Sequence, residues 1–449
     1  MRLIRHLAKA IRNPRRALGV AIHHLLVSSL VTPLARVLGP RGLAWLACQA
    51  CEVAPNGGAG TRVLVLNRLY FAKDVDQLRE RAADLDLVSL DTHILSLAQM
   101  QWLPPELCEQ IAYAARSRPE HASAWATAEA YAGHLLDMAR ARWDVAAVLA
   151  SNVDYWQHES FRRACRVRGV PFLVLCQEEQ TVRSVYELSL DMYRAPGFRY
   201  GGTAVAVFGP GTRDMLIESG CCSPAQVHMV GAPRFDPWLD GSVGVQPARL
   251  VTLLAFEGEQ YFAPICYEET LRAFAAASVR HARCGLEFVL KCKDAADEAR
   301  ARDQLARTDH RLTLTNAAPL TELLPASRLV IGYNSLAVIE ALFSDAEVVI
   351  PQWGDAARPA REQIVDPADS ACAAVYRFAS SPAELGRLLE EAVRTSRPQA
   401  DRAARRALVG RWFHLPEEGA STATARFIRD HVAAAKLGTP DILAHGAVT

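Results

Sequence analysis

One turn in this sequence, Gly332-Tyr333-Asn334-Ser335, has the residue types and the setting of a phosphate-binding corner. The apolar run 329–331 before it predicts a buried parallel strand, and Asn334 or Ser335 is a natural N-cap for the helix expected next. A second strand is expected at 347–350, which completes a βαβ unit. Such a turn directs backbone N–H groups and the positive end of a helix dipole at one place, so we expect a phosphorylated ligand there. The alternative is a plain N-cap in a structural βαβ unit.

Two lysines occupy a second position that suits an anionic ligand. Lys291 and Lys293 follow the predicted strand 288–290, and ligands of open α/β sheets bind at the carboxyl ends of the strands. A lysine there can neutralise a diphosphate leaving group. The alternative is a pair of solvated lysines. Glu340 lies in an otherwise apolar helical stretch. Its carboxylate either marks the solvent-exposed side of that helix or accepts hydrogen bonds from a ligand.

Acidic residues follow two predicted strands in the first half of the chain. Ser-Asn-Val-Asp-Tyr at 151–155 comes after one strand, and Gln-Glu-Glu at 177–179 comes after the next. A transfer to a hydroxyl group needs a base that takes the hydroxyl proton as the new bond forms. The candidates for this base are Asp154, Glu178 and Glu179, with His158 behind them. The alternative is that these loop carboxylates are merely solvated.

The acidic residues and histidines are not spaced like a metal site. No Asp-x-Asp triplet directly follows a predicted strand, and no cluster of His and Asp has ligand spacing. Asp74-Val-Asp76 and Asp84-Leu-Asp86 occur, but neither lies at the carboxyl end of a predicted strand. We therefore expect neither a metal nor a cofactor.

Short apolar runs alternate with amphipathic stretches from residue 62 onward. The strands and helices that this alternation predicts must position the candidate site residues. A linker-like stretch at 238–248 divides it into two blocks. We expect an α/β protein with two Rossmann-like, doubly wound domains that face each other across a cleft. Helices are expected at 106–141, 158–168, 267–283, 295–306 and 335–344. Strands are expected at 63–66, 85–90, 145–150, 172–175, 204–208, 227–230, 251–256, 288–290, 312–314, 329–331, 348–350 and 374–378.

The composition excludes some classes of protein. The 449 residues carry a net charge of +1, but residues 1–51 hold eight Lys and Arg and no acidic residue. The remainder holds 42 basic and 49 acidic residues, so nucleic acid is not an expected partner. Eleven scattered cysteines, two of them adjacent at 221–222, suit a reducing compartment. The lone pair Cys48 and Cys51 is interpreted as small buried side chains.

The basic N-terminal segment, residues 1–55, is expected to be a separate helical region. Residues 1–16 have apolar positions at helical spacing opposite basic ones, and residues 17–35 contain no formal charge. We expect a basic amphipathic helix or hairpin that lies on an anionic membrane surface through residues 1–36. The alternatives are a helix packed on the body and a transmembrane span, which the central His23-His24 disfavours. The expected location is cytoplasmic, peripheral on the inner face of the membrane.

Three motifs, in order along the chain, resemble those of bacterial capsule and surface-polysaccharide biosynthesis proteins and their CDP-glycerol phosphotransferase relatives. The first is Gly231-Ala-Pro-Arg-Phe-Asp236, preceded by Phe208-Gly-Pro-Gly211 and Ile217-Glu-Ser-Gly220. The second is the turn and helix of residues 332–340, and the third is Pro416-Glu-Glu-Gly-Ala-Ser-Thr-Ala423. The likeness covers residues 60–435 and implies a GT-B fold, with an acceptor domain at 60–238 and a nucleotide-donor domain at 249–435.

The resemblance also implies roles for residues of the donor site. A glutamate at the position of Glu340 receives the ribose hydroxyls in similar proteins. Many relatives carry Lys-Pro-His-Pro where this chain has Lys291-Cys-Lys-Asp294, which weakens a CDP-alcohol donor role. Arg234 and Asp236 could instead pair structurally at the hinge. The residues assigned to the donor nucleotide are Asn334, Ser335, Glu340, Lys291, Lys293, Gly231 and Arg234.

The expected function is glycosyl transfer from a nucleotide-sugar donor to a surface-polysaccharide or lipid-linked acceptor, without a metal. A nucleotide-sugar 2-epimerase is an alternative, but such enzymes carry Gly-Gly after the serine, where this chain has Leu336-Ala337. CDP-alcohol phosphotransfer is a second alternative. A non-catalytic subunit of a polysaccharide assembly complex is a third.

Overall fold

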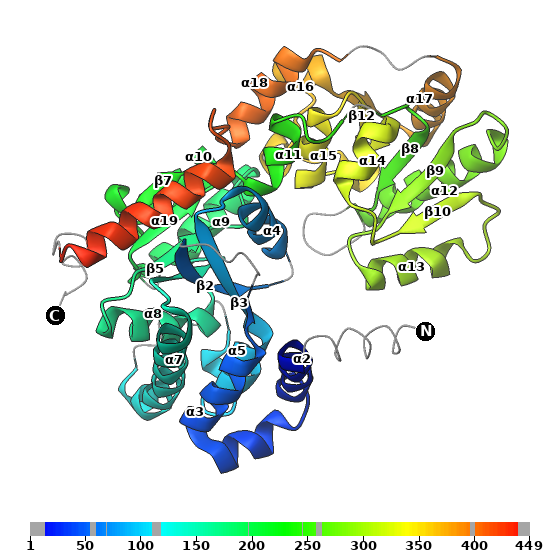
Figure 1. The fold of residues 1–449 in the computed structure, drawn as a ribbon. Coiled ribbons are helices and arrows are strands. Elements are labelled where there is room, and N and C mark those ends of the chain that lie inside the picture. The colour runs from blue at the N-terminus through cyan, green and yellow to red at the C-terminus, as the bar shows by residue number, and fades with distance from the viewer. Residues whose placement is uncertain are drawn as a thin grey trace. The chain divides into compact units, whose positions relative to one another are not determined.

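The computed structural model describes residues 14–53, 60–68, 70–109, 118–195, 197–244, 246–256, 263–395 and 400–438 (Figure 1). Contacts divide the chain into two compact units. Unit 1 is made of the residues up to Glu179, Leu188–Arg234 and the residues from Phe413 onward. Unit 2 is made of Gln180–Glu187 and Phe235–Trp412. Each unit contains one sheet.

The sheet of unit 1 has seven strands in the order β1-β3-β2-β4-β5-β6-β7. All neighbours pair in parallel except the short edge strand β1, which is antiparallel to β3. Every residue of β4, β5 and β6 is buried, as expected for a parallel sheet whose two faces are covered by helices. The strands are β1 (Glu52–Val53), β2 (Thr61–Asn67), β3 (Leu85–Asp91), β4 (Ala147–Ala150), β5 (Phe172–Leu175), β6 (Ala204–Val207) and β7 (Val227–Met229).

The helices of unit 1 follow its strands and then return at the end of the chain. Helix α9 (Arg183–Arg194) contains the unit boundary at Leu188. The other α-helices are α2 (Pro14–Leu26), α3 (Val31–Ala50), α4 (Ala72–Arg81), α5 (Thr92–Gln99), α7 (Ala122–Trp143), α8 (Trp156–Val167), α10 (Pro210–Glu218) and α19 (Ala420–Lys436).

The sheet of unit 2 has six parallel strands in the order β10-β9-β8-β11-β12-β13. Numbered within the unit, this is the 3-2-1-4-5-6 order of the Rossmann fold. The strands are β8 (Leu250–Leu254), β9 (Glu287–Lys291), β10 (Leu312–Thr315), β11 (Ser327–Ile331), β12 (Glu347–Pro351) and β13 (Arg377–Ala379). The helices are α11 (Asp236–Leu239), α12 (Pro264–Arg280), α13 (Ala295–Leu305), α14 (Leu320–Ala326), α15 (Leu336–Glu340), α16 (Ser370–Val375), α17 (Pro382–Arg394) and α18 (Arg402–Trp412).

The fold class expected from the sequence, two Rossmann-like parallel-sheet domains, is confirmed. A strand of the structure overlaps each of the twelve expected strands. The single long helix expected at 106–141 is wrong, because 3-10 turns begin at Pro105 and Pro119 and the α-helix starts only at Ala122. Proline has no backbone N–H to continue a helix. Residues 110–117 lie outside the described part of the chain.

The end of the chain belongs to unit 1, whereas the second domain was expected to run to residue 435. The N–H of His414 donates to the carbonyl of Phe208 at the end of β6 (2.8 Å), and α19 packs on α4 and β6. Gly231 lies against this returning segment with φ +79°, and a Cβ there would come within 2.5 Å of the His414 carbonyl oxygen. A return of the chain to its first domain leaves no local pattern, which is why the sequence did not reveal it.

The N-terminal helices pack on unit 1. Helix α3 contacts α2, α5 and α7, and its kink lies at Gly39, where φ is +61°. His23 of α2 contacts Asp91 at the end of β3 (2.8 Å). Among the described residues, no single helix has the length and apolar character to cross a membrane. Helices α2 and α3 meet that test only as a pair bent by 110°.

Two expectations concern residues outside the described part of the chain. The amphipathic helix expected within residues 1–16 falls mostly on residues 1–13, and the tail that begins at Thr439 is likewise not described. Both stay predictions.

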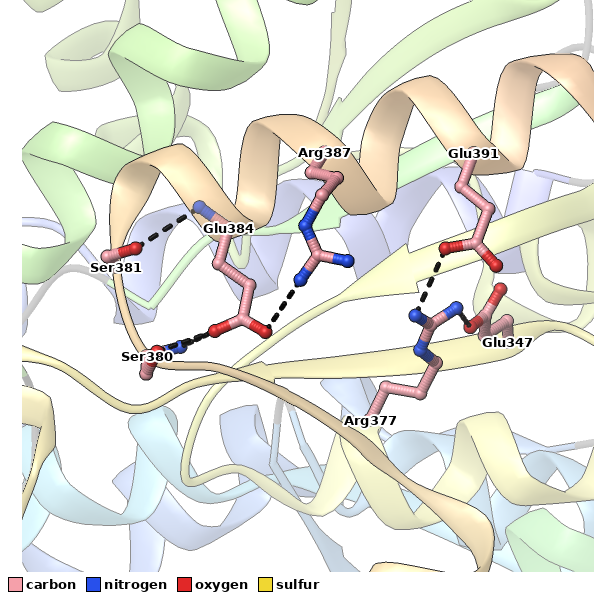
Figure 2. Close-up of polar contacts among 7 residues, drawn as sticks. All are labelled: Glu347, Arg377, Ser380, Ser381, Glu384, Arg387 and Glu391. Carbon is pink, nitrogen blue, oxygen red and sulfur yellow. Dashed lines mark hydrogen bonds and ion pairs between the residues drawn. The ribbon is translucent and has the colours of Figure 1, made fainter.

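A charge network joins β12, β13 and α17 in unit 2 (Figure 2). Arg377 of β13 donates to Glu347 of β12 (2.6 Å) and to Glu391 of α17 (3.1 Å). At the start of α17, the hydroxyl of the N-cap residue Ser381 accepts the backbone N–H of Glu384. The carboxylate of Glu384 accepts the backbone N–H of Ser380, the residue before the cap. This cap and the arginine hold α17 against the last strand of the sheet.

We expect Gly231→Ala to destabilise the protein more than a matched glycine substitution does. Gly241 has nearly the same φ, +78°, but a Cβ there meets no atom within 4 Å. Gly241→Ala should therefore lose only the backbone penalty of about 1–2 kcal/mol. Gly231→Ala should lose roughly 1–3 kcal/mol more, because the backbone at His414 must move. Denaturant unfolding of both variants measures the difference, and equal losses would contradict the contact.

Candidate functional site

Unit 2 brings the turn 332–335 to the point where its strand order reverses. Strands β8 and β11 are neighbours at the centre of the sheet, and their crossovers lead to opposite sides. The crevice outside the carboxyl ends of such a pair is the ligand site of doubly wound folds. Gly332 is buried there, and a Cβ on it would lie 2.7 Å from Cγ1 of Val338. The glycine therefore lets α15 begin close to the strand end.

Asn334 uses its side chain to hold a neighbouring loop. Its Nδ2 donates to the carbonyl of Glu362 (2.9 Å), and its Oδ1 accepts the N–H of Ile364 (2.8 Å). Its φ of +45° lies in the left-handed region, which asparagine tolerates better than most residues. The hydroxyl of Tyr333 also donates to this loop, at the carbonyl of Ala356 (2.9 Å). These contacts fix the shape of the corner, and a direct role of Asn334 toward a nucleotide stays a prediction.

Ser335 is the N-cap residue of α15, as the sequence indicates. Its backbone is extended, with φ −135°, and its hydroxyl makes no capping hydrogen bond. The residue is half-buried at the carboxyl edge of the sheet. Helix α15 is only five residues long and continues as a 3-10 turn, so the dipole at its start is weaker than that of the long helix expected at 335–344.

Glu340 accepts a hydrogen bond from the indole N–H of Trp238 through Oε1 (3.2 Å). The ring of Trp238 lies nearly parallel to that of Phe343, with centroids 6.3 Å apart. Sequence reasoning missed Trp238, which precedes Glu340 by about a hundred residues in a stretch with linker composition. Its aromatic type next to that linker was the only available signal. The indole holds the Glu340 carboxylate in one position.

Lys291 and Lys293 take different positions at the end of β9. The ammonium group of Lys291 donates to the carbonyls of Cys292 (3.0 Å) and Asn316 (2.5 Å), so it ties the ends of β9 and β10 together. Lys293 is exposed in the loop that leads to α13, and the next residue, Asp294, caps that helix. Of the two, Lys293 is the exposed one.

The three candidate bases of unit 1 lie in loops that follow neighbouring strands, β4 and β5, at the carboxyl edge. Asp154 is buried and accepts the hydroxyl of Tyr193 through Oδ2 (3.1 Å). Glu178 is exposed. The pKa of its carboxyl is raised by the protein packed around the loop and by the charge of Asp154. The structure thus brings Asp154 and Glu178 together, close enough for their charges to interact.

Glu179 is buried, and its side chain caps the N-terminus of α10 although the residue is not part of that helix. Its Oε1 accepts the N–H of Thr212 in the first turn of α10 (2.8 Å), where the N-cap residue Gly209 has no side chain. Burial raises the pKa of the Glu179 carboxyl to about 7, against the opposing effect of the Thr212 hydrogen bond. This geometry indicates a positioning role at the strand end. Glu178 is then better placed than Glu179 to meet a substrate.

A chain of polar contacts crosses the same edge of unit 1. The guanidinium of Arg68 lies 4.3 Å from the ring centroid of Tyr155, whose hydroxyl accepts Nε2 of Gln177 (3.2 Å). The carbonyl of Gln177 accepts a guanidinium N–H of Arg234 (3.3 Å). Arg68 directly follows β2, and the order β3-β2-β4 makes that strand end the reversal point of this sheet. Arg68 was missed because a single arginine after a strand carries no pattern.

His158 does not have the character of a base. It is buried behind Tyr155, with ring centroids 5.5 Å apart, and burial lowers its pKa to about 3. The imidazole is therefore neutral at physiological pH and would not hold a proton taken from an acceptor.

Gly231 and Arg234, which were assigned to the donor nucleotide, lie in unit 1, whereas the other donor residues lie in unit 2. Gly231 packs against the chain end, as described above. Arg234 forms an ion pair with the buried Asp74 and also donates to it through Nε (2.9 Å). Asp74 is thus a carboxylate that the structure places against Arg234, and the pairing of Arg234 with Asp236 stays a prediction. Their roles toward a nucleotide stay predictions.

The described ranges contain no group of three or more His, Cys, Asp or Glu side chains arranged to hold a metal ion.

Comparisons with known proteins find likeness at the level of structure. No family model matches the sequence, and no curated protein matches it. A glycosyltransferase from Rickettsia africae has 10% identity and a TM-score of 0.44, over 87% of this chain and 100% of its own. A UDP-N-acetylglucosamine 2-epimerase from Rickettsia bellii has 11% identity and a TM-score of 0.45, over 85% and 98%.

A third similar structure is an α,α-trehalose 6-phosphate synthase from Burkholderia multivorans. It has 12% identity and a TM-score of 0.43, over 87% of this chain and 100% of its own. At such identities and scores the likeness does not decide function, and the fold class rests on the strand orders given above.

We expect Glu179→Gln to change how stability depends on pH. The folded carboxyl has a pKa of about 7 and an ordinary glutamate about 4.5. The folded state therefore binds the extra proton between these values, and the contribution of Glu179 to stability falls as pH rises from 4.5 to 7. The free energy of unfolding of the wild type, relative to Glu179→Gln, should drop by on the order of 2–3 kcal/mol between pH 5 and pH 8.

Denaturant unfolding at the two pH values measures this drop. Glu120→Gln, at an exposed glutamate of the same unit, is the matched control and should show no such change. A pH-independent difference for Glu179→Gln would contradict the raised pKa.

Proposed function

We propose that this protein is an enzyme, a glycosyltransferase that moves a sugar from a nucleotide-activated donor to a polysaccharide or lipid-linked acceptor. The observation that carries the proposal is that each of the two parallel sheets has chemically reactive or charged residues at its carboxyl edge. In unit 2 that edge holds the βαβ corner at Ser335 and the fixed carboxylate of Glu340. In unit 1 it holds Asp154 and Glu178, whose carboxyl has a raised pKa. One edge suits a nucleotide and the other suits proton removal.

In the proposed reaction the acceptor hydroxyl displaces the nucleoside diphosphate at the anomeric carbon. Glu178 takes the hydroxyl proton as the new bond forms. The protein packed around the loop and the charge of Asp154 keep the pKa of Glu178 raised, and Glu179 fixes the loop by capping α10. The corner at Ser335 and the cation of Lys293 stabilise the departing diphosphate. Independence from metal ions is part of the proposal, and unchanged turnover in the presence of EDTA tests it.

The proposal includes a place for the enzyme. An acceptor linked to lipid would be reached from the cytoplasmic face of the membrane. We accordingly place the protein as a peripheral enzyme on the inner face, held at an anionic surface through residues 1–36. Support comes from the basic charge of this segment.

The nucleotide site is tested by calorimetry with UDP, GDP, CDP and CMP. We expect one nucleoside diphosphate to bind, and Glu340→Ala to weaken its binding by on the order of 1–3 kcal/mol through loss of a charged hydrogen bond to ribose. Trp238→Phe removes the indole N–H from Glu340 but keeps the ring beside Phe343, so it tests the positioning of the carboxylate separately. Binding by the folded Glu340→Ala variant as tight as by the wild type would refute the ribose role.

Failure of all four nucleotides to bind would refute the transferase and both alternative enzymes together. Conversion of UDP-GlcNAc without an acceptor would instead favour the epimerase, and release of CMP from a CDP-alcohol would favour the phosphotransferase.

The base is tested with Glu178→Gln, assayed by nucleotide release from the nucleotide sugar that calorimetry identifies. We expect a loss of roughly 10²-fold or more in kcat with nucleotide affinity kept. Because the pKa of Glu178 is raised and the ionised form is the base, wild-type activity should fall, as pH is lowered, at a higher pH than for an ordinary glutamate. Glu120→Gln should behave as wild type, and full activity of Glu178→Gln would assign the base elsewhere.

A further inference from the structure

Exposed apolar side chains gather on the two N-terminal helices. Thirteen large apolar side chains are exposed in the described residues, and six of them lie in α2, α3 and the bend between them. Six such side chains on two short helices are more than the scattered single residues that need no explanation. The six are Leu18, Val20, Leu30, Val37, Leu38 and Trp45. We call them the apolar face of the hairpin.

The same helices have a second apolar side that is already used. Ile22, Leu26, Val31 and Ala35 are buried. Helix α3 also packs along α5 and α7. The apolar face of the hairpin is therefore additional to the side that holds these helices on unit 1. Packing within the unit does not explain it.

A break in α3 lies directly after two of its exposed apolar residues. Gly39, with φ +61°, and Pro40 interrupt the helix, and the blue ribbon of α3 in Figure 1 is not straight. Val37 and Leu38 directly precede the break, and Val37 is 81% exposed. The break thus ends the first part of α3 with two neighbouring apolar side chains in solvent.

The charge around this face selects the partner. Residues 1–51 hold eight Lys and Arg and no acidic residue, and the exposed Arg36 and Arg41 flank Val37 and Leu38. Two copies of this chain that met through the hairpin would bring like charges together. An anionic bilayer offers both an apolar layer and negative headgroups.

We propose that the apolar face of the hairpin docks on an anionic lipid bilayer. Val37, Leu38 and the indole of Trp45 enter the interface, and Arg36 and Arg41 contact headgroup phosphates. The helices lie on the membrane without crossing it. This inference rests on, and deepens, the membrane part of the proposed function, and it does not depend on sugar transfer.

The first test is co-sedimentation of the full chain with phosphatidylglycerol–phosphatidylcholine vesicles. Val37→Asp with Leu38→Asp should weaken binding at least tenfold. Val167→Asp is the matched control, because Val167 is 77% exposed but lies on α8. Wild-type binding by the double variant, or an equal loss in the control, would overturn the proposal. Deletion of residues 1–36 is avoided because it removes the buried Ile22 and Leu26.

The second test separates the charge from the apolar contact. Arg36→Gln and Arg41→Gln should each weaken binding to the anionic vesicles about fivefold, and added salt should weaken the wild type more than the variants. Vesicles of phosphatidylcholine alone should bind the wild type less than the mixed vesicles. Equal binding to both vesicle types would overturn the assignment to an anionic surface.

A third set of measurements tests whether the protein self-associates through this face and whether vesicle binding is independent of nucleotide binding. Sedimentation velocity should give the same mass for the wild type and the Val37→Asp, Leu38→Asp variant. A wild-type dimer that this variant dissociates would assign the face to a second copy of the chain and overturn the proposal. Nucleotide calorimetry on the variant should match the wild type, so loss of vesicle binding alone leaves the transferase proposal intact.

Discussion

The parallel pairing of the strands is the constraint on which the rest of this structure depends. Parallel strands require crossovers, the crossovers cover both faces, and all strand ends of one kind then lie along one edge. In unit 2 this edge collects Lys291, Ser335 and the loop held by Asn334. In unit 1 it collects Arg68, Asp154 and Glu178. Chemistry-bearing residues that are far apart in sequence become neighbours because the sheets have no other way to be connected.

Much of the fold could be predicted because it depends on local, repeated patterns. Most of the expected strands are apolar runs of the kind that a sheet buried on both faces requires, as β4 and β5 show. The failures involved information that local patterns do not carry. The amphipathic pattern at 106–141 predicts one helix, but Pro105 and Pro119 begin 3-10 turns before α7 starts. The return of residues from Phe413 to unit 1 depends on contacts across two hundred residues.

The sequence predicts which loops carry the candidate site residues, but it does not predict the contacts that these residues make. The loops after β4, β5, β9 and β11 were singled out correctly as strand ends. What each side chain does there depends on partners from elsewhere. Glu179 differs from Glu178 because Thr212 donates to it, and Glu340 is fixed by Trp238. Arg234 is matched by Asp74, which is 160 positions away. Such pairs form only in the tertiary fold, and no spacing of residues in the sequence predicts them.

The return of the chain end to unit 1 has a consequence for the order of synthesis. Unit 2 forms almost entirely from Phe235–Trp412, so its residues have all been added before residue 413 is. Unit 1 starts first but lacks α19 and the His414–Phe208 hydrogen bond until the residues up to Lys436 have been added. Domains usually fold in the order in which they emerge from the ribosome. Of the two units, the one that begins first can therefore be completed only after the other.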